Sequence, residues 1–154
     1  MNMSVNSLVA KFSENIKNEE PLYVFLKTHL CVESIMIQIL EKNVPNPKAI
    51  KFDNFNFAQK MQLVHALNII GDDMREAYNK FNRVRNDLAH YHNQEIDGEV
   101  IEKLYNTLPK DKKSFAYEFC LGNPDIIGTL RGFCTLLVVY LVSKGDYIVY
   151  KVSE

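Results

Sequence analysis

Apolar residues recur at helical spacing along nearly the whole chain, and this feature constrains the fold more than any other. In segments 5–16, 57–67 and 74–88 apolar side chains stand three or four residues apart, which places them on one face of a helix. The length of 154 residues is typical of one domain, and the 47% apolar content is sufficient for a core. We therefore predict an all-α bundle of about six helices, forming a single domain over residues 1–154.

Local signals predict where these helices begin and end. Pro21 suits the first turn of a long helix to about Lys42, and Asn56 followed by Gln59 is typical of a capping box. We expect Gly71 to end the helix that Asn56 begins. Asp72 or Asp73 should begin the next helix. Asp97 should begin the one after it, with Ile96 and Ile101 as a hydrophobic staple, and Pro109 should end that helix. We expect the last helix to begin at Asn123–Pro124 and to run to Gly145.

The long helix after Pro21 is apolar nearly all round, which predicts a central place in the bundle. One face of it carries Leu22, Leu26, Leu30, Ile37 and Leu40. Segments 115–121 and 147–152 instead favour extended structure, because they are rich in aromatic and β-branched residues. They would form either a small two-stranded ribbon near the C-terminus or tail segments lying on the bundle.

The charge balance limits the classes of partner. Eighteen basic and nineteen acidic residues give a net charge of −1, which argues against a strongly cationic duplex-DNA binder but leaves a local basic patch open. The acidic residues in the expected turn Gly71-Asp72-Asp73 also suit phosphate contact poorly, which disfavours sequence-specific DNA binding. Cys31, Cys120 and Cys134 include no CxxC pair, so we expect reduced thiols. The uncharged stretch Gly132–Ser143 is shorter than the roughly 20 residues that span a bilayer, and we interpret it as a core helix. With no secretory signal visible, we expect a cytoplasmic protein.

The segment 83–92, Arg-Val-Arg-Asn-Asp-Leu-Ala-His-Tyr-His, carries most of the chemistry. Arg85 offers a planar fork of donors that suits phosphate oxygens. Histidine is the side chain whose unperturbed pKa lies nearest neutrality, so His90 and His92 can exchange protons. These groups fit cleavage of RNA by internal attack of the 2′-hydroxyl, in which a base removes the proton and a cation stabilises charge on the phosphate. That reaction requires no metal.

Helix geometry constrains this interpretation. Asn86 and His90 are four residues apart and share a face, whereas Arg85 and His90 are about 140° apart around a straight helix. We expect Arg85 to meet His90 where the helix unwinds, or where a second subunit contributes to one cleft, and so we predict a homodimer. The alternative is structural: basic side chains near a helix C-terminus also interact with its unpaired carbonyls and its dipole.

These residues resemble the Arg-x4-His motif of the HEPN superfamily, with Asn86 at the polar position directly after Arg85. HEPN domains are α-helical bundles, often dimeric, and many are metal-independent RNases of toxin–antitoxin, abortive-infection and CRISPR systems. Segment 57–71, followed by a helix that ends Arg-Asn-x-x-Ala-His, looks like the mannitol-operon repressor branch. The resemblance covers roughly residues 22–92, and it implies a HEPN-like fold.

The resemblance implies that Arg85 and His90 are the catalytic pair, with Asn86 positioning one of them. Arg85 would hold the scissile phosphate, and His90 would be the general base or acid. One toxin branch carries a modified tyrosine two residues after the histidine. This chain has His92 there, so that regulation is not implied. The repressor branch has no known nuclease activity, which keeps a non-catalytic regulator open.

Other residues extend the candidate site. Glu33 lies among apolar residues, where a carboxylate is costly unless paired. It would therefore orient Arg85 or tune His90, or else reach solvent at the edge of the helix. The residues expected to form an RNA-binding rim are Lys60, Lys80, Arg83 and His92, although solvated helix faces carry such charges too. His29 and His65 have no ligand-spaced partner, so we expect no metal site, and nothing in the sequence indicates a cofactor.

Two functions follow from these features. The first is a metal-independent protein that cleaves or binds RNA in a prokaryotic defence or toxin system, with Arg85 and His90 at its site. The second is a non-catalytic helical module that binds a cognate protein, as a repressor-like regulator, an antitoxin or a toxin-immunity protein. Exposure of the motif distinguishes them, because catalytic groups must be reachable from a cleft.

Overall fold

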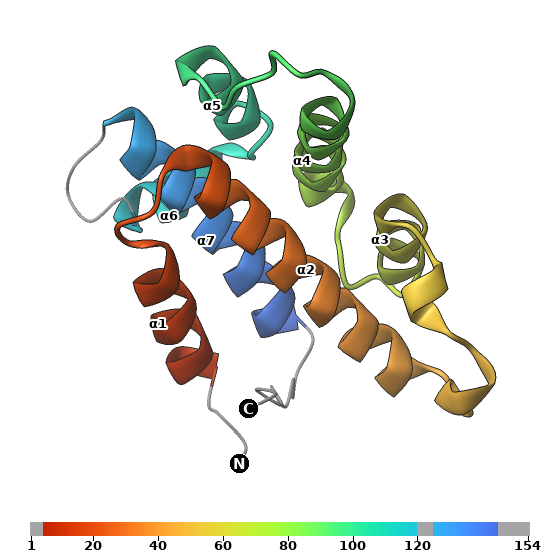
Figure 1. The fold of residues 1–154 in the computed structure, drawn as a ribbon. Helices are drawn as coiled ribbons and strands as arrows, with labels where there is room; N and C mark the ends of the chain where they lie inside the picture. The colour runs from red at the N-terminus through yellow and green to blue at the C-terminus, as the bar shows by residue number, and fades with distance from the viewer. Residues whose placement is uncertain (1–4, 120–124, 145–154) are drawn as a thin grey trace.

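The computed structural model describes residues 5–119 and 125–144, which form a helical bundle around α7 (Ile126–Lys144) (Figure 1). The other helices are α1 (Val5–Ile16), α2 (Pro21–Asn43), α3 (Phe57–Ala66), α4 (Asp72–His90), α5 (Gly98–Tyr105) and α6 (Lys110–Glu118), with short 3₁₀ turns at Pro47–Ala49 and Phe52–Asn54. The predicted all-α class is confirmed, since the described part of the chain contains helices and no strand.

Helix α7 forms the centre of the core. It packs against α1, α2, α5 and α6, and Leu130, Phe133, Leu137 and Leu141 are fully buried. Helices α2 and α7 are both long and apolar enough to cross a bilayer by length and composition alone. In the most apolar window of α7, 67% of the residues are buried inside the bundle. This burial indicates that the apolar stretch 132–143 is a helix of the protein core. The cytoplasmic location remains a prediction.

The apolar face of α2 that carries Leu22, Leu26, Leu30, Ile37 and Leu40 is only partly buried. Leu22, Leu26 and Leu30 are exposed, with Leu30 at 68% of its full exposure; we call these three residues the α2 leucine stripe. The core side of α2 carries Val24, Phe25, Thr28, His29, Cys31, Val32, Ile35, Met36, Ile39 and Leu40. A helix that is apolar nearly all round does not specify its inner face, so the packing of α2 against α7 and α3 decides which residues are buried.

The turn between α3 and α4 also differs from the prediction. Helix α3 ends well before Gly71, and Asn68 takes a φ of 58°, a left-handed conformation that asparagine tolerates. Gly71 is the N-cap residue of α4, and Asp72 and Asp73 lie in its first turn. The Gly71 N–H donates to the Tyr140 hydroxyl at 2.9 Å, and a Cβ on Gly71 would lie 3.3 Å from that oxygen. Glycine therefore suits the close approach of this turn to α7.

The predicted N-caps of α3 and α5 are confirmed. Asn56 Oδ1 accepts from the Gln59 N–H and the Asn56 N–H donates to Gln59 Oε1, both at 2.9 Å, which completes a capping box. Asp97 Oδ1 accepts from the Val100 N–H at 2.9 Å. Both caps are local interactions within four residues, and such interactions are readable from sequence.

Helix α6 is absent from the sequence prediction. Pro109 is the N-cap residue of α6, and α5 ends earlier, at Tyr105. Residues 115–118 of the expected ribbon belong to α6 and are helical, whereas 120–121 and 147–152 lie outside the described residues. Helix α6 packs on α7 and buries Ala116, and this tertiary packing outweighs the β propensity of its aromatic residues.

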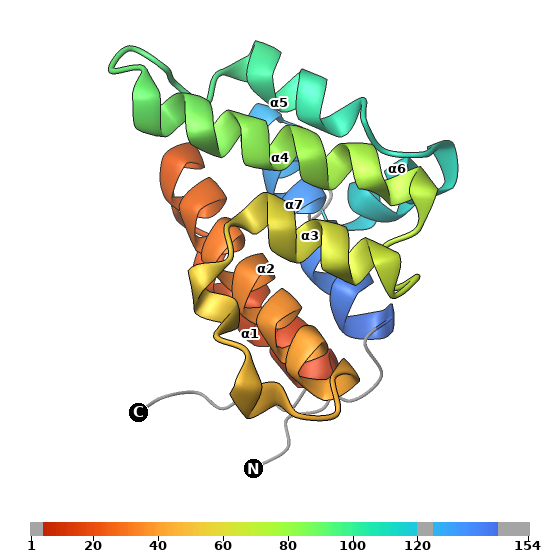
Figure 2. The same ribbon diagram turned by 90° about the vertical axis from the view of Figure 1, so that its right-hand side faces the viewer.

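Helices α3 and α4 run antiparallel and lie side by side across α2 (Figure 2). The N-terminus of α3 and the C-terminal half of α4 are therefore at the same edge of the pair. Both contact α2. This arrangement brings three segments distant in sequence to one place, where the candidate site lies.

Candidate functional site

A cavity of about 400 Å³ lies between α2, the start of α3 and the C-terminal half of α4. Its walls are formed by His29, Glu33, Asn56, Phe57, Ala58, Asn82, Arg85, Asn86 and His90. All four residues predicted as catalytic, Glu33, Arg85, Asn86 and His90, are therefore in the wall of one cavity. Three of them come from α4 and the fourth comes from α2.

Arg85 and His90 reach this cavity from an unbroken helix. Helix α4 continues to His90, and Tyr91 is its C-cap residue, so the expected unwinding does not occur. Asn82, Asn86 and His90 follow one another at four-residue intervals along one face of α4. Arg85 lies three residues from Asn82, beside that row, and its long side chain borders the same cavity. The two side chains thus share the cavity without sharing one helix face.

Arg85 is exposed, and its guanidinium is available to a ligand. Arg85 Nη1 donates a hydrogen bond to the Oδ1 of the neutral Asn86 side chain at 3.5 Å. Among the described residues no carboxylate forms a salt bridge with Arg85. An arginine without an acidic partner at the edge of a cavity is suited to bind an anion.

Lys60 does not belong to an exposed basic rim, as the sequence suggested. Its side chain is 2% exposed, and its Nζ donates to Glu33 Oε1 at 2.6 Å. Glu33 is thus paired, as its apolar surroundings require, but with Lys60 of α3. Lys60 thus balances the negative charge of Glu33. Glu33 also approaches His29, with 3.9 Å between Oε2 and Nδ1.

His29 is buried in the wall of the cavity. It is 6% exposed, and its ring stacks on Phe57, with centroids 4.5 Å apart, and on Phe81, with centroids 5.7 Å apart. Its Nε2 is buried and has no hydrogen-bond partner among the described residues. Burial is the largest influence on the pKa of His29 and lowers it, and the positive charges of Arg85 and Lys60 lower it further. The negative charge of Glu33 and a side-chain interaction with Asn82 raise the pKa and so oppose this effect.

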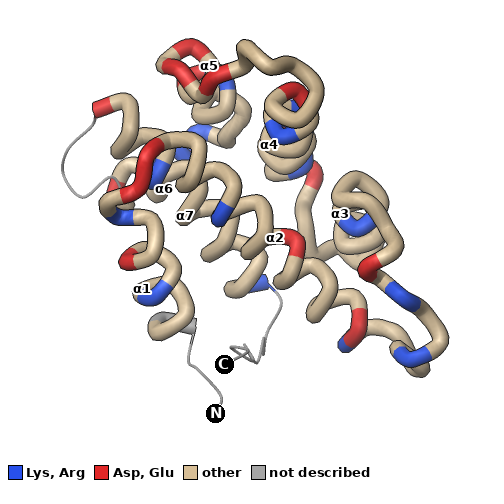
Figure 3. Tube along the Cα trace, viewed as in Figure 1, with Lys and Arg blue, Asp and Glu red and all other residues tan. Residues whose placement is uncertain are grey.

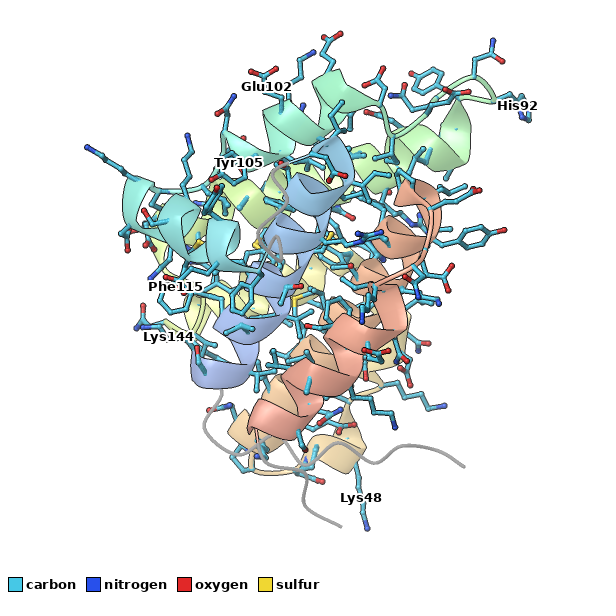
Figure 4. All side chains as sticks on the ribbon, turned by 90° about the vertical axis from the view of Figure 1, so that its left-hand side faces the viewer. Lys48, His92, Glu102, Tyr105, Phe115 and Lys144 are labelled. Carbon is cyan, nitrogen blue, oxygen red and sulfur yellow. The ribbon has the colours of Figure 1, made fainter. Side chains whose placement is uncertain are left out.

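The remaining residues predicted to bind RNA lie outside the cavity. Lys80 is half-buried and Arg83 is exposed, both on α4. His92 follows the end of α4, is exposed, and points away from the bundle in Figure 4. Basic and acidic residues are mixed over the helices (Figure 3). The structure therefore does not join these three residues to the cavity.

Sequence reasoning missed His29 and Asn82. The signal that would have indicated them is spacing: His29 lies four residues before Glu33, and Asn82 lies four residues before Asn86, so each shares a helix face with a predicted site residue. The sequence shows His29 without a ligand-spaced partner, and the aromatic rings that stack on it come from α3 and α4. Within residues 5–119 and 125–144 no group of three His, Cys, Asp or Glu side chains lies together as a metal site would require.

Comparison with known proteins gives no family for this chain. No family model matches it, and neither a curated protein nor a solved structure is significantly similar to it. The HEPN resemblance therefore depends on the motif residues, and HEPN membership stays a prediction.

Proposed function

We propose that the protein is a HEPN-type, metal-independent RNase of a prokaryotic defence or toxin system, which binds single-stranded RNA in this cavity. One observation carries the proposal: Glu33, Arg85, Asn86 and His90, selected from sequence for this chemistry, line one open cavity. Sealed, fully hydrogen-bonded positions would have supported a structural role instead.

Arg85 binds the scissile phosphate. It is exposed and has no acidic partner among the described residues, while the negative charge of Glu33 is balanced by Lys60 at 2.6 Å. The first turn of α3 borders the same cavity at Phe57 and Ala58. The positive end of its helix dipole adds to the attraction for an anion. Asn86 holds the Arg85 guanidinium in position.

The reaction is an internal transfer of the phosphodiester. The RNA 2′-oxygen attacks the phosphorus atom, the bond to O5′ breaks, and the products are a 2′,3′-cyclic phosphate and a 5′-hydroxyl. The chain supplies a base for the 2′-hydroxyl proton, an acid for O5′ and a cation for the charge on the non-bridging oxygens. His90 serves in proton transfer, and Arg85 stabilises the charge.

The test is cleavage of a fluorescent single-stranded RNA in EDTA. Wild type is expected to yield cyclic-phosphate ends, and Arg85→Ala and His90→Ala should each lower the rate at least 100-fold. Arg75→Ala is the matched control, because Arg75 is exposed on the same helix but does not line the cavity. Equal activity in all four proteins, or none in wild type across varied sequences, refutes the proposal.

The α2 leucine stripe favours the alternative function, a helical module that binds another protein. Exposed apolar residues at helical spacing are typical of contact surfaces. In that case Arg85→Ala would leave partner binding intact, whereas Leu26→Glu would abolish it.

The Leu26→Glu variant also tests the proposed homodimer by light scattering. A wild-type dimer that Leu26→Glu converts to a monomer identifies a second copy of the chain as the occupant of the α2 leucine stripe. A monomeric wild type at high concentration contradicts the homodimer.

A further inference from the structure

His29 is a buried polar group of the cavity that the roles above leave unused. A buried imidazole nitrogen without a hydrogen bond is costly, since burial removes its contact with water. The two rings on either side, Phe57 and Phe81, hold the imidazole plane in place. The unpartnered atom is Nε2, and His29 lines the cavity that holds Arg85 and His90. A ligand in this cavity would supply the missing hydrogen bond.

The neighbours of His29 define which nitrogen carries the proton. The Glu33 carboxylate lies on the Nδ1 side, 3.9 Å from that atom. A negative charge there favours the neutral tautomer with the proton on Nδ1, which leaves a lone pair on Nε2. Glu33 is itself held by Lys60 at 2.6 Å, so its position does not depend on the ligand. The carboxylate therefore favours a proton on Nδ1, which leaves Nε2, an atom without a hydrogen-bond partner among the described residues, as the acceptor.

The charge state of His29 suits a base. Burial among aromatic rings lowers the pKa of His29 below its usual value of 6.5, Arg85 and Lys60 lower it further, and Glu33 and Asn82 act in the opposite direction. These groups come from α2, α3 and α4, the three helices around the ring. At neutral pH the imidazole is therefore uncharged and can accept a proton.

We propose that His29 Nε2 is the general base of the RNA cleavage and that His90 is the general acid, an inference that rests on the proposed function. His29 Nε2 takes the proton of the 2′-hydroxyl as that oxygen bonds to phosphorus. The bond from phosphorus to O5′ breaks, and protonated His90 gives its proton to O5′. His29 then returns its proton to water and His90 regains one, so the protein ends the cycle unchanged.

This division of roles matches the positions of the two histidines. His29 is fixed in the wall of the cavity on α2, where it stays neutral. His90 is exposed at the C-terminus of α4 and borders the same cavity. The two histidines therefore reach one cavity from two different helices, α2 and α4.

A substrate with sulfur in place of O5′ separates base from acid, because a thiolate leaves without a proton. With ordinary RNA, His29→Gln and His90→Ala are each expected to lose at least 100-fold in kcat. With the sulfur substrate, His90→Ala should regain most of the wild-type rate and His29→Gln should not. His65→Gln is the matched control, since His65 is a partly buried histidine outside the cavity. Rescue of His29→Gln in place of His90→Ala overturns the proposal.

Nitrogen NMR of wild type provides a readout that does not depend on a variant. The His29 signals should show an unprotonated Nε2 at pH 7, and this signal should shift when a 2′-fluoro RNA oligonucleotide, which is not cleaved, is added. A proton on Nε2, or no shift at saturating oligonucleotide, overturns the proposal. If wild type cleaves RNA and His29→Gln matches it, this inference alone fails. If wild type cleaves no RNA, the proposed function fails too.

Discussion

The ion pair between Glu33 and Lys60 offers the sharpest test of the energetics of the site. The Lys60 side chain is 2% exposed and that of Glu33 is 27% exposed, with 2.6 Å between Nζ and Oε1. Glu33→Gln would leave a buried ammonium without a counter-charge, which costs about 3–5 kcal/mol. Lys60→Met would leave a carboxylate that still contacts water, which costs about 1–3 kcal/mol. The asymmetry follows from the difference in exposure.

A double-mutant cycle isolates the pair. The double variant Glu33→Gln/Lys60→Met should cost at least about 1 kcal/mol less than the sum of the single variants, because it leaves no unpaired charge. Urea unfolding at 25 °C measures each free energy, and Glu33→Gln should lower Tm by about 6–20 °C in a domain of this size. NMR gives a second readout: the pKa of His29 should rise in Lys60→Met and fall in Glu33→Gln, since each variant removes one of its causes.

The pair Glu99–Lys103 provides the control cycle. It is also a close ion pair, but both side chains are largely exposed on α5. Exposed pairs are screened by water, so the Glu99→Gln/Lys103→Met cycle should be additive. Additive costs in the Glu33–Lys60 cycle, or a Glu33→Gln variant as stable as the control variants, would refute the reasoning from burial.

Three further predictions concern stability and accessibility. Folding lowers the pKa of His29, so below about pH 6.5 the unfolded chain binds more protons than the folded one, and the free energy of unfolding should fall as the pH falls. Urea unfolding at pH 7.5 and 5.5 should show this slope, and the His29→Gln variant should lack it. Burial raises the pKa of Cys134 to about 12, so a thiol reagent should label it, as read by peptide mass spectrometry, in urea only; rapid labelling of native protein would contradict this. Asn56→Ala removes the capping box of α3 and should cost about 1 kcal/mol in urea unfolding, whereas no loss would show that the cap is redundant.

The part of the site on α4 was predictable because it is contiguous in sequence. Arg85, Asn86 and His90 lie within six positions of one another, and helix spacing alone relates them. Glu33 was also predictable, because a carboxylate among apolar residues requires an explanation. Its actual partner, Lys60, was not, because nothing in the spacing of residues 33 and 60 indicates that α2 and α3 cross there.

The role of His29 depends on tertiary structure in the same way. Its aromatic neighbours Phe57 and Phe81 come from α3 and α4, and its unpartnered Nε2 is defined only once these helices pack. Sequence spacing predicts that α4 unwinds, or that a second subunit contributes, to join Arg85 to His90. Helix α4 does not unwind, and both side chains border the same cavity within one chain.

The amino-acid sequence by itself determined the helical class, the N-caps at Asn56 and Asp97 and the cluster of polar residues at the end of α4, since each depends on interactions within a few positions. Only the tertiary structure decided that Leu30 faces solvent, that Lys60 is buried and that residues 115–118 are helical. For residues 115–118, packing on α7 outweighs the β propensity of the aromatic side chains. Leu30 and Lys60 share another physical reason. Apolar burial is not directional, so the face that a helix buries is chosen by the shapes of the helices packed against it.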